Sequence, residues 1–234
     1  MSYPPSDFAT NGITFPIPVL DPDELCAAQA EHARLAESHG GALTRLDRLH
    51  LKCGWAYDLT THRRVVDAVS SLLGPEVIVW GTLLLCKPPH DREFVAWHQD
   101  SAYAGYLGDT PAVSAWLALS DSTAENGCMR VVPGSQKTKL DHVEAHRPLN
   151  MLSRGQEIAA DVDESKAVDV ELRAGEMSIH HVDIVHGSRA NCSAGWRIGF
   201  IIRYTTPQIA SCPTAVTIAR GRGAAHLATV QTRP

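Results

Sequence analysis

The first third of the chain carries residues at helical spacing. Asp21-Pro22-Asp23-Glu24 supplies an acidic N-cap, proline at the first helical position and the glutamate of a capping box. Gly40-Gly41 ends this predicted helix, and Gly74-Pro75 ends a second one that begins near Thr61. The residues at this spacing form one face of each helix: Leu25, Ala28, His32, Leu35 and Ala36 in the first, and Val65, Val66, Val69, Leu72 and Leu73 in the second.

From Val77 onward the pattern is that of strands. Short segments rich in β-branched or aromatic residues alternate with turn sequences: 77–86, 112–119, 128–132, 167–172, 176–181 and 197–204. Helices followed by many short strands indicate a mainly β sandwich or barrel with added helices. Residues 135–166 are polar and poor in strand signals, so we expect a long loop that covers part of the domain.

The chain length of 234 residues suits a single β domain. We therefore predict one domain over 1–234, with a helical N-terminal decoration at 1–76, a core at 77–206 and a C-terminal tail at 207–234. Hydrophobic residues make up 44% of the chain and charged residues 20%, so a core can form without disulfides or structural metals.

Charge and composition narrow the classes of partner. The net charge is −5 and the one arginine-rich stretch, Arg220-Gly221-Arg222, is short, which argues against nucleic-acid binding. No stretch approaches the ~18 apolar residues of a membrane helix. The six cysteines form no CxxC pair and the N-terminus lacks an apolar signal region, so we expect free thiols and a cytoplasmic location. A small-molecule ligand is the expected partner, and no obligate protein partner is evident.

The candidate chemistry begins at His98-Gln99-Asp100. Side chains two apart on a strand share a face, so this imidazole and this carboxylate can converge. With a second histidine they form the facial triad of non-haem iron(II) sites, which leaves three coordination positions open. The chain has 12 histidines and also contains His181-Val182-Asp183, so one such pair alone is a weak indication.

Two residues further along strengthen the first pair. His186 is available as the second histidine, and Arg197 opens the apolar segment 198–202. An arginine directed into an apolar barrel would be costly without an anion, whereas at a strand edge it would be an ordinary surface residue. A planar guanidinium suits the distal carboxylate of 2-oxoglutarate. The residues alone leave both interpretations of Arg197 open.

Four blocks of sequence carry a resemblance to a known family: WHQDSAY (97–103), AWLALSDSTAENGCMRVVPGSQ (115–136), LRAGEMSIHH (172–181) and HGSRANCSAGWRIGFIIRY (186–204). The chain resembles the phytanoyl-CoA dioxygenase family of iron(II)/2-oxoglutarate oxygenases. The resemblance implies a double-stranded β-helix, a cupin-like jelly roll, with the N-terminal helices packed on one sheet. It also implies iron(II) as cofactor, 2-oxoglutarate and O2 as co-substrates, and a small-molecule substrate.

The family's metal ligands carry over onto matching motifs. His98, Asp100 and His186 are similar to the iron ligands. The resemblance makes His181-Val182-Asp183 the unused pair, because it falls just before the distal histidine. Halogenating relatives have alanine or glycine in place of the aspartate. The carboxylate of Asp100 therefore implies hydroxylation or a related oxidation.

The family's co-substrate residues carry over as well. Arg197 resembles the residue that pairs with the far carboxylate of 2-oxoglutarate, and Ser188 resembles its hydroxyl partner. Trp116 resembles the aromatic residue that lines the co-substrate pocket. The family often adds an N-terminal basic residue, for which three candidates remain: Arg45, Arg48 and Lys52.

Residues beside these motifs or in the covering segment are candidate substrate contacts: Trp97, Tyr103, Arg154, Gln156 and Glu157, with Trp80 and Leu84 on a shared strand face at the mouth or in the core. We expect Gln99 to pack on the opposite side of the strand, and three loop histidines to be solvated: His90, His142 and His146. Two other functions stay open. One is a cupin-like metal isomerase or dioxygenase that does not use 2-oxoglutarate, and the other is a non-catalytic, metal-free β-sandwich binding module.

Overall fold

Antiparallel sheets dominate the structure, a computed structural model that describes residues 8–209, 212, 215–223, 227 and 229–234. The helices are α1 (Phe8–Asn11), α2 (Pro22–Ser38), α3 (Gly54–Thr60) and α4 (Arg63–Leu73), with short 3-10 turns η2 (Leu49–Leu51), η3 (Asp100–Tyr103), η4 (Gly105–Leu107), η5 (Ser135–Lys137) and η6 (Glu164–Lys166). The strands are β1 (Ile13–Pro18), β2 (Arg45–Asp47), β3 (Val77–Lys87), β4 (Val95–His98), β5 (Ala112–Ala118), β6 (Met129–Val131), β7 (His142–Glu144), β8 (Gln156–Ile158), β9 (Val168–Val170), β10 (Glu176–His181), β11 (His186–Ser188), β12 (Arg197–Thr205) and β13 (Thr217–Arg220).

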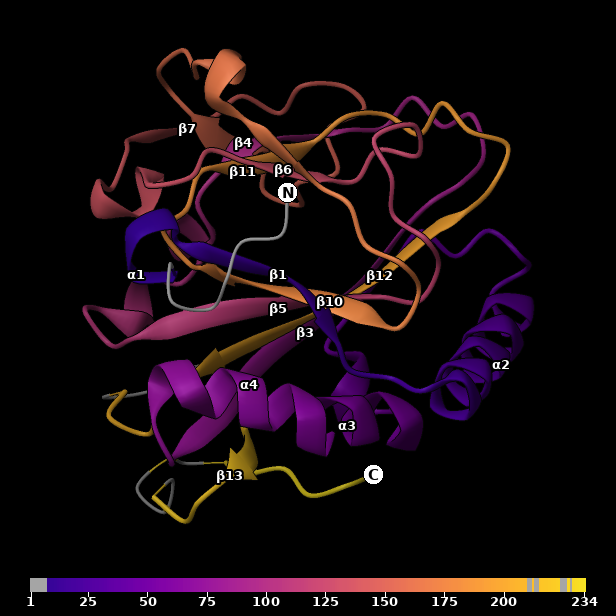
Figure 1. Cartoon of the computed structure of the whole chain (residues 1–234), viewed down its shortest axis with the longest axis vertical. Helices are drawn as coiled ribbons and strands as arrows, with labels where there is room; N and C mark the ends of the chain where they lie inside the picture. The colour runs from indigo at the N-terminus through magenta and orange to yellow at the C-terminus, as the bar shows by residue number, and fades with distance from the viewer. Residues whose placement is uncertain (1–7, 210–211, 213–214, 224–226, 228) are drawn as a thin grey trace.

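The two main sheets are stacked. The larger one has the order β1-β10-β5-β12-β3-β13, with β2 also paired to β3, and the smaller one has the order β4-β11-β6-β9. Figure 1 shows the larger sheet across the middle of the molecule, the smaller sheet above it, and α3 and α4 below it. Leu85 and Ile201 of the larger sheet share a buried cluster with Met129 and Val131 of the smaller one. The mainly β, jelly-roll prediction is confirmed, and so are helices on one sheet.

The predicted helices form for the expected local reasons. The Asp21 side chain accepts a hydrogen bond from the Glu24 backbone N–H at 3.0 Å, and the Glu24 side chain accepts one from Asp21 at 2.8 Å, which completes the capping box of α2. Helix α4 buries Val65, Val66 and Val69 and contacts β3 and β5. This packing covers the outer face of the larger sheet, so its inner face is available for a cavity. Within the described ranges, no helix is long and apolar enough to cross a membrane.

The structure contains elements that the sequence pattern does not predict. Strand β1 contains Pro16 and Pro18 and lies at the edge of the larger sheet, where a missing N–H is tolerated. Helix α3 is only seven residues long. The expected loop 135–166 includes the hairpin β7–β8. Strand β13, within the expected tail, pairs with β3 at the opposite edge of the larger sheet.

A β-bulge separates Trp80 from Leu84. Val79 and Gly81 pair with consecutive residues of β12, so Trp80 is the additional residue of the bulge. Leu84 is fully buried in the cluster on the helix side of the sheet, whereas Trp80 lines the cavity between the sheets. The prediction that the two side chains share a face is therefore wrong, because strict alternation fails at a bulge.

Candidate active site

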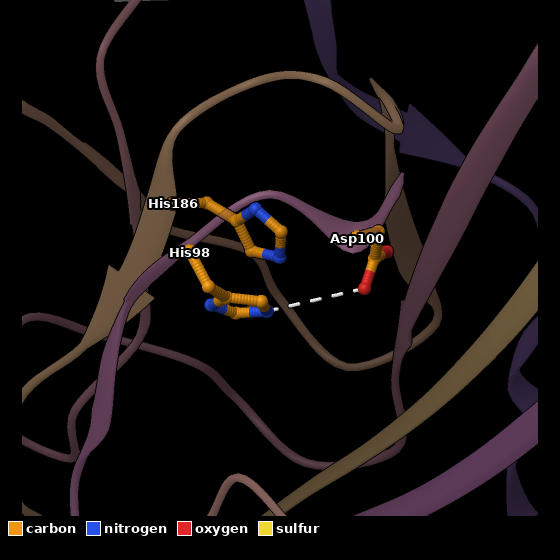
Figure 2. A group of neighbouring side chains, drawn as sticks. All are labelled: His98, Asp100 and His186. Carbon is orange, nitrogen blue, oxygen red and sulfur yellow. Dashed lines mark ion pairs between the residues drawn. The ribbon is translucent and has the colours of Figure 1, made fainter. Parts of the chain in front are cut away.

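The three predicted ligands converge between β4 and β11. His98 is the last residue of β4, His186 is the first residue of β11, and the two are paired in the antiparallel register. One ligand atom from each of His98, Asp100 and His186 lies within 4.8 Å of the others. The imidazole centroids are 4.0 Å apart, and His98 Nε2 lies 3.9 Å from Asp100 Oδ1 (Figure 2).

Asp100 reaches this point by a different route from the one expected. Strand β4 ends at His98, and Asp100 begins the 3-10 turn η3. The two residues therefore do not share a strand face, which corrects the reasoning from strand alternation. Asp100 Oδ2 instead accepts a hydrogen bond at 2.6 Å from Ser114 Oγ, on strand β5 of the larger sheet, and this bond orients the carboxylate.

Backbone carbonyls fix the orientation of both imidazoles. His98 Nδ1 lies 2.9 Å from the Ala96 carbonyl oxygen, and His186 Nδ1 lies 3.0 Å from the Ile184 carbonyl oxygen. A carbonyl only accepts, so each Nδ1 carries the proton and each Nε2 keeps a free lone pair. Histidine ligands in metal sites are oriented in this way by their second nitrogen. The donor set and its orientation fit a divalent transition metal.

The protonation states of the group also suit a metal. Burial lowers the pKa of His98, and burial with the nearby His98 lowers the pKa of His186 well below its usual value. Burial opposes ionisation of Asp100, but Arg203 and the surrounding histidines hold its pKa well below the usual value. The group therefore presents neutral imidazoles and an ionised carboxylate, which are the forms that bind metals.

His180 is a neighbour of this group that the sequence reasoning missed. Its Nε2 lies 3.7 Å from Asp100 Oδ2, and its ring centroid is 4.8 Å from that of His186. It is buried on β10, directly before His181. Strand alternation gives the available signal, since neighbours on β10 face opposite sides and the one before His181 points into the barrel.

The second His-x-Asp pair lies elsewhere. His181 Nδ1 accepts a hydrogen bond from the Asp183 backbone N–H at 3.0 Å, and both residues line a separate cavity of about 510 Å³. In the part of the chain that the structure describes, the only three-residue group spaced for a metal is His98, Asp100 and His186.

Gln99 lies between His98 and Asp100 in the chain, lines the second cavity and makes several hydrogen bonds. Its Nε2 donates to the Asp183 carbonyl at 2.5 Å and to the Thr138 carbonyl at 2.8 Å, and its Oε1 accepts from the Leu140 N–H at 2.8 Å. Its own N–H donates to His142 Nε2 at 3.0 Å, so His142 is not the solvated loop histidine that we expected. These bonds tie the covering segment to the residue that follows β4 and to the loop that precedes β11.

Arg197 is buried with donors to spare. Its side chain is 1% exposed and stacks 5.4 Å from the Trp116 ring. Its Nη1 donates to the Gly127 carbonyl at 2.6 Å, but its Nε and Nη2 have no hydrogen-bond partner among the described residues. Gly199 allows this stack, because a Cβ there would lie 2.2 Å from Trp116. The surface interpretation of Arg197 is therefore wrong.

Lys87 is a second buried basic residue that the sequence reasoning missed. It pairs with Arg197 across β3 and β12, and its Nζ donates to Ser188 Oγ at 2.8 Å and to the Arg189 carbonyl. Burial and the charge of Arg197 lower the pKa of Lys87 to about 6, so without an anion beside it the amine is mostly neutral at pH 7, and a bound anion would restore its charge. A protonated Lys87 only donates, so Ser188 would then accept from it and keep its hydroxyl hydrogen free to donate elsewhere. Two cations and a free hydroxyl donor fit a carboxylate.

A cavity of about 250 Å³ joins these two ends. Its lining includes the three ligands, Ser188, Trp116 and Arg197, so the predicted cofactor residues meet in one space. The expected contacts that also line it are Arg45, Trp80, Tyr103 and Arg154. The other expected contacts lie outside its lining: Arg48, Lys52, Leu84, Trp97, Gln156 and Glu157. Trp97 instead donates to Glu164 at 3.2 Å, beneath the Arg130 guanidinium.

Comparisons with known proteins agree with this geometry. The model of the Phytanoyl-CoA dioxygenase (PhyH) family matches residues 8–199. A probable phytanoyl-CoA dioxygenase of Caenorhabditis elegans is 29% identical over 152 residues, which are 62% of this chain and 49% of that protein. A probable alpha-ketoglutarate-dependent hypophosphite dioxygenase of Stutzerimonas stutzeri is 30% identical over 166 residues, 69% of this chain and 57% of that protein. The chain thus spans about half the length of these curated relatives.

A solved structure matches over a larger share of both chains. The apo form of ThoJ, described as a non-heme monooxygenase, superposes with a TM-score of 0.81 and is 35% identical. The match covers 98% of this chain and 87% of that one. The fold around the triad is therefore similar to that of a known enzyme over nearly its whole length.

Proposed function

The chain belongs to the phytanoyl-CoA dioxygenase family, and on this premise we propose that it is an iron(II)- and 2-oxoglutarate-dependent oxygenase that hydroxylates a small organic molecule. The observation that supports this most is one cavity with a ligand triad at its centre and the unmatched donors of Arg197 at its far end. A bound metal accounts for the triad, and a bound diacid accounts for a buried guanidinium that has no anion of its own. The two features together support this chemistry more strongly than either one does by itself.

His98, Asp100 and His186 are the residues that would hold iron. When bound, iron with 2-oxoglutarate supplies the activation of O2, one oxygen atom going to the substrate and the other to succinate, which forms with CO2. The protein's part is to hold two neutral imidazoles and one carboxylate on one side of the metal, so that the other side stays open. The carbonyls of Ala96 and Ile184 preserve this arrangement.

Arg197, Ser188 and Lys87 would hold the far carboxylate of 2-oxoglutarate. Arg197 offers two unmatched donor groups, and Ser188, oriented by Lys87, offers its hydroxyl hydrogen. Trp116 stacks on the guanidinium and limits its rotation. Anchored in this way, the diacid would point its keto end toward the triad, and the enclosed cavity would exclude water from the reacting atoms.

The two alternative functions make no use of this end of the cavity. A metal isomerase or a dioxygenase without 2-oxoglutarate needs no anchor for a diacid, and a metal-free binding module needs no triad. Lys87 and Arg197 are buried opposite each other, and both can carry charge there only beside an anion, so this pair supports an anionic ligand.

Anaerobic addition of iron(II) and 2-oxoglutarate tests the proposal. We expect a weak visible charge-transfer band near ~500 nm, since chelation needs an open-sided triad. Admission of O2 with a substrate should then release one succinate per O2 consumed. A protein that binds iron but gives no band, or that turns over without succinate, would favour the isomerase alternative.

Replacing Lys87 with methionine is expected to raise KM for 2-oxoglutarate about tenfold to a hundredfold, because Ser188 loses the charged donor that orients its hydroxyl. The iron affinity should change less than threefold, since Lys87 does not touch the triad. Steady-state succinate formation measures the first quantity and iron titration the second. Lys139→Met, at an exposed lysine, is the matched control. A KM within twofold of wild type would remove Lys87 from this role.

A further inference from the structure

Strand β12 carries a second arginine into the cavity. Residues two apart on a strand share a face, and Arg197, Ile201 and Arg203 all line the cavity. Arg197 begins β12, whereas Arg203 lies near its other end, where it pairs with Ser114 on β5. Its Nη2 is 3.5 Å from Asp100 Oδ1, and its side chain is 20% exposed. The face that anchors the proposed diacid thus presents another cation near the mouth.

The bulge at Trp80 makes room for a ligand beside Arg203. Arg203 pairs with Gly81 on β3, and a Cβ at Gly81 would meet no heavy atom within 4 Å. The bulge turns the Trp80 ring beneath the Arg203 guanidinium, 5.6 Å from its centroid. The Tyr106 ring packs edge-on against Trp80 at 5.9 Å. The arginine is therefore held in place by a ring while the space next to it stays open.

The donors at this place are unmatched. Arg203 makes no hydrogen bond to any residue that the structure describes, although a guanidinium has five N–H donors. Trp80 Nε1 is buried and likewise lacks a partner within the described part of the chain. The nearest anion, Asp100, would share its charge with a bound metal and so attract Arg203 less. A mostly buried cation in this state favours an additional anion.

The other arginines at the mouth differ from Arg203. Arg45 donates twice to the Asp47 carboxylate at 2.9 Å and once to the Met151 carbonyl at 3.2 Å, so its fork is occupied. The Arg154 side chain is 54% exposed, lies over the Tyr103 ring and has Glu144 at 3.7 Å. Arg203 thus combines burial with free donors.

We propose that Arg203 and Trp80 form a subsite for an oxyanion, such as a carboxylate, that is carried by the primary substrate. The inference rests on the proposed oxygenase function and names the substrate class of that same cavity. Arg203 lies six residues from Arg197, roughly 20 Å along the strand. A five-carbon diacid spans only about 5 Å between its carboxyl carbons, estimated from carbon–carbon bonds of about 1.5 Å. The acid of a separate molecule is therefore the better occupant.

Calorimetric titration of protein loaded with Mn(II) and 2-oxoglutarate tests the subsite. The probes are benzoate, phenylacetate and 3-phenylpropionate, each against its amide, because they carry one carboxylate at three distances from a flat ring that can face Trp80. We expect at least one acid to bind tenfold or more tightly than its amide. Arg203→Gln should reduce this preference to twofold or less and change the Kd of 2-oxoglutarate less than threefold.

Two further variants complete the experiment. Arg173→Gln, at an exposed arginine outside the cavity lining, should keep the preference for the acid within threefold of wild type. Arg203→Lys keeps the positive charge but lacks the paired N–H donors of a guanidinium. It should bind the acid at least threefold more weakly than wild type, and its Mn(II) affinity should be unchanged. This variant decides the matter if Arg203→Gln no longer binds Mn(II).

The outcomes separate the two proposals. Equal binding of acid and amide in all three pairs would overturn the subsite, and so would an Arg203→Gln variant that weakens 2-oxoglutarate as much as the acid, because the anion would then be the co-substrate's own carboxylate. Failure of the wild-type protein to bind Mn(II) or 2-oxoglutarate would instead contradict the proposed function.

Discussion

Replacing His186 with alanine is expected to weaken iron(II) binding at least a hundredfold and to reduce 2-oxoglutarate turnover about a thousandfold. Loss of an outer hydrogen-bond partner of a metal ligand already costs roughly 10- to 100-fold, so loss of a ligand itself should cost more. His186 and His98 face each other across one strand pair, whereas the neighbouring imidazole of His180 comes from β10, where it pairs with Ser114. Iron titration and succinate formation measure the two effects.

His181→Ala is the matched control for this substitution. His181 lies five residues earlier and lines the separate cavity, where its side chain is 32% exposed. We expect iron affinity and turnover within threefold of wild type. If His186→Ala kept more than a tenth of the activity, or if His181→Ala lost as much as His186→Ala, the assignment of the triad would fail.

The residues of the candidate triad could be predicted from the sequence, but their geometry could not. The spacing of His98 and Asp100 suggested a shared strand face, whereas the strand ends between them. The decisive contact is the register that places His98 opposite His186, 88 positions apart in the chain numbering. Register between strands so distant depends on the whole sheet, which local patterns do not contain.

The far end of the cavity contains a residue that the sequence did not single out. Lys87 precedes a Pro-Pro turn and has the sequence context of a surface residue, yet it is fully buried opposite Arg197. Like charges directly across a strand pair are destabilising, so no rule of strand pairing would have placed them together. Such a conflict between local rules and structure is expected at functional sites.

The direction of the Trp80 side chain is another feature that the sequence pattern predicts wrongly. Alternation predicts that it shares the face of Leu84, and a single additional residue in β3 reverses this. The consequence bears on the proposed subsite, because the bulge turns the indole under Arg203 instead of into the helix-side core. A bulge leaves little trace in a sequence, since it needs no special residue at the additional position.

Replacing Arg197 with methionine is expected to have two opposite effects. Affinity for 2-oxoglutarate should fall at least a hundredfold, since removing one partner of a buried charge pair costs about 3–5 kcal/mol. In the absence of 2-oxoglutarate, however, the variant should be more stable than wild type by about 1 kcal/mol. The gain comes from removing a buried charge that faces Lys87 with two unmatched donor groups. The loss of the hydrogen bond to Gly127 offsets part of it.

The order of stability should therefore reverse when the co-substrate is added. At a concentration of 2-oxoglutarate 100-fold above Kd, binding stabilises the wild-type fold by about 2.7 kcal/mol, and the variant gains little. Chemical unfolding of the Mn(II)-loaded proteins, with and without 2-oxoglutarate, measures both differences. Arg173→Met, at an exposed arginine, should remain within about 0.5 kcal/mol of wild type in both conditions. A methionine variant that is less stable than wild type even without 2-oxoglutarate would show that Arg197 serves the fold through Gly127, and the unmatched donors would then no longer argue for a bound diacid.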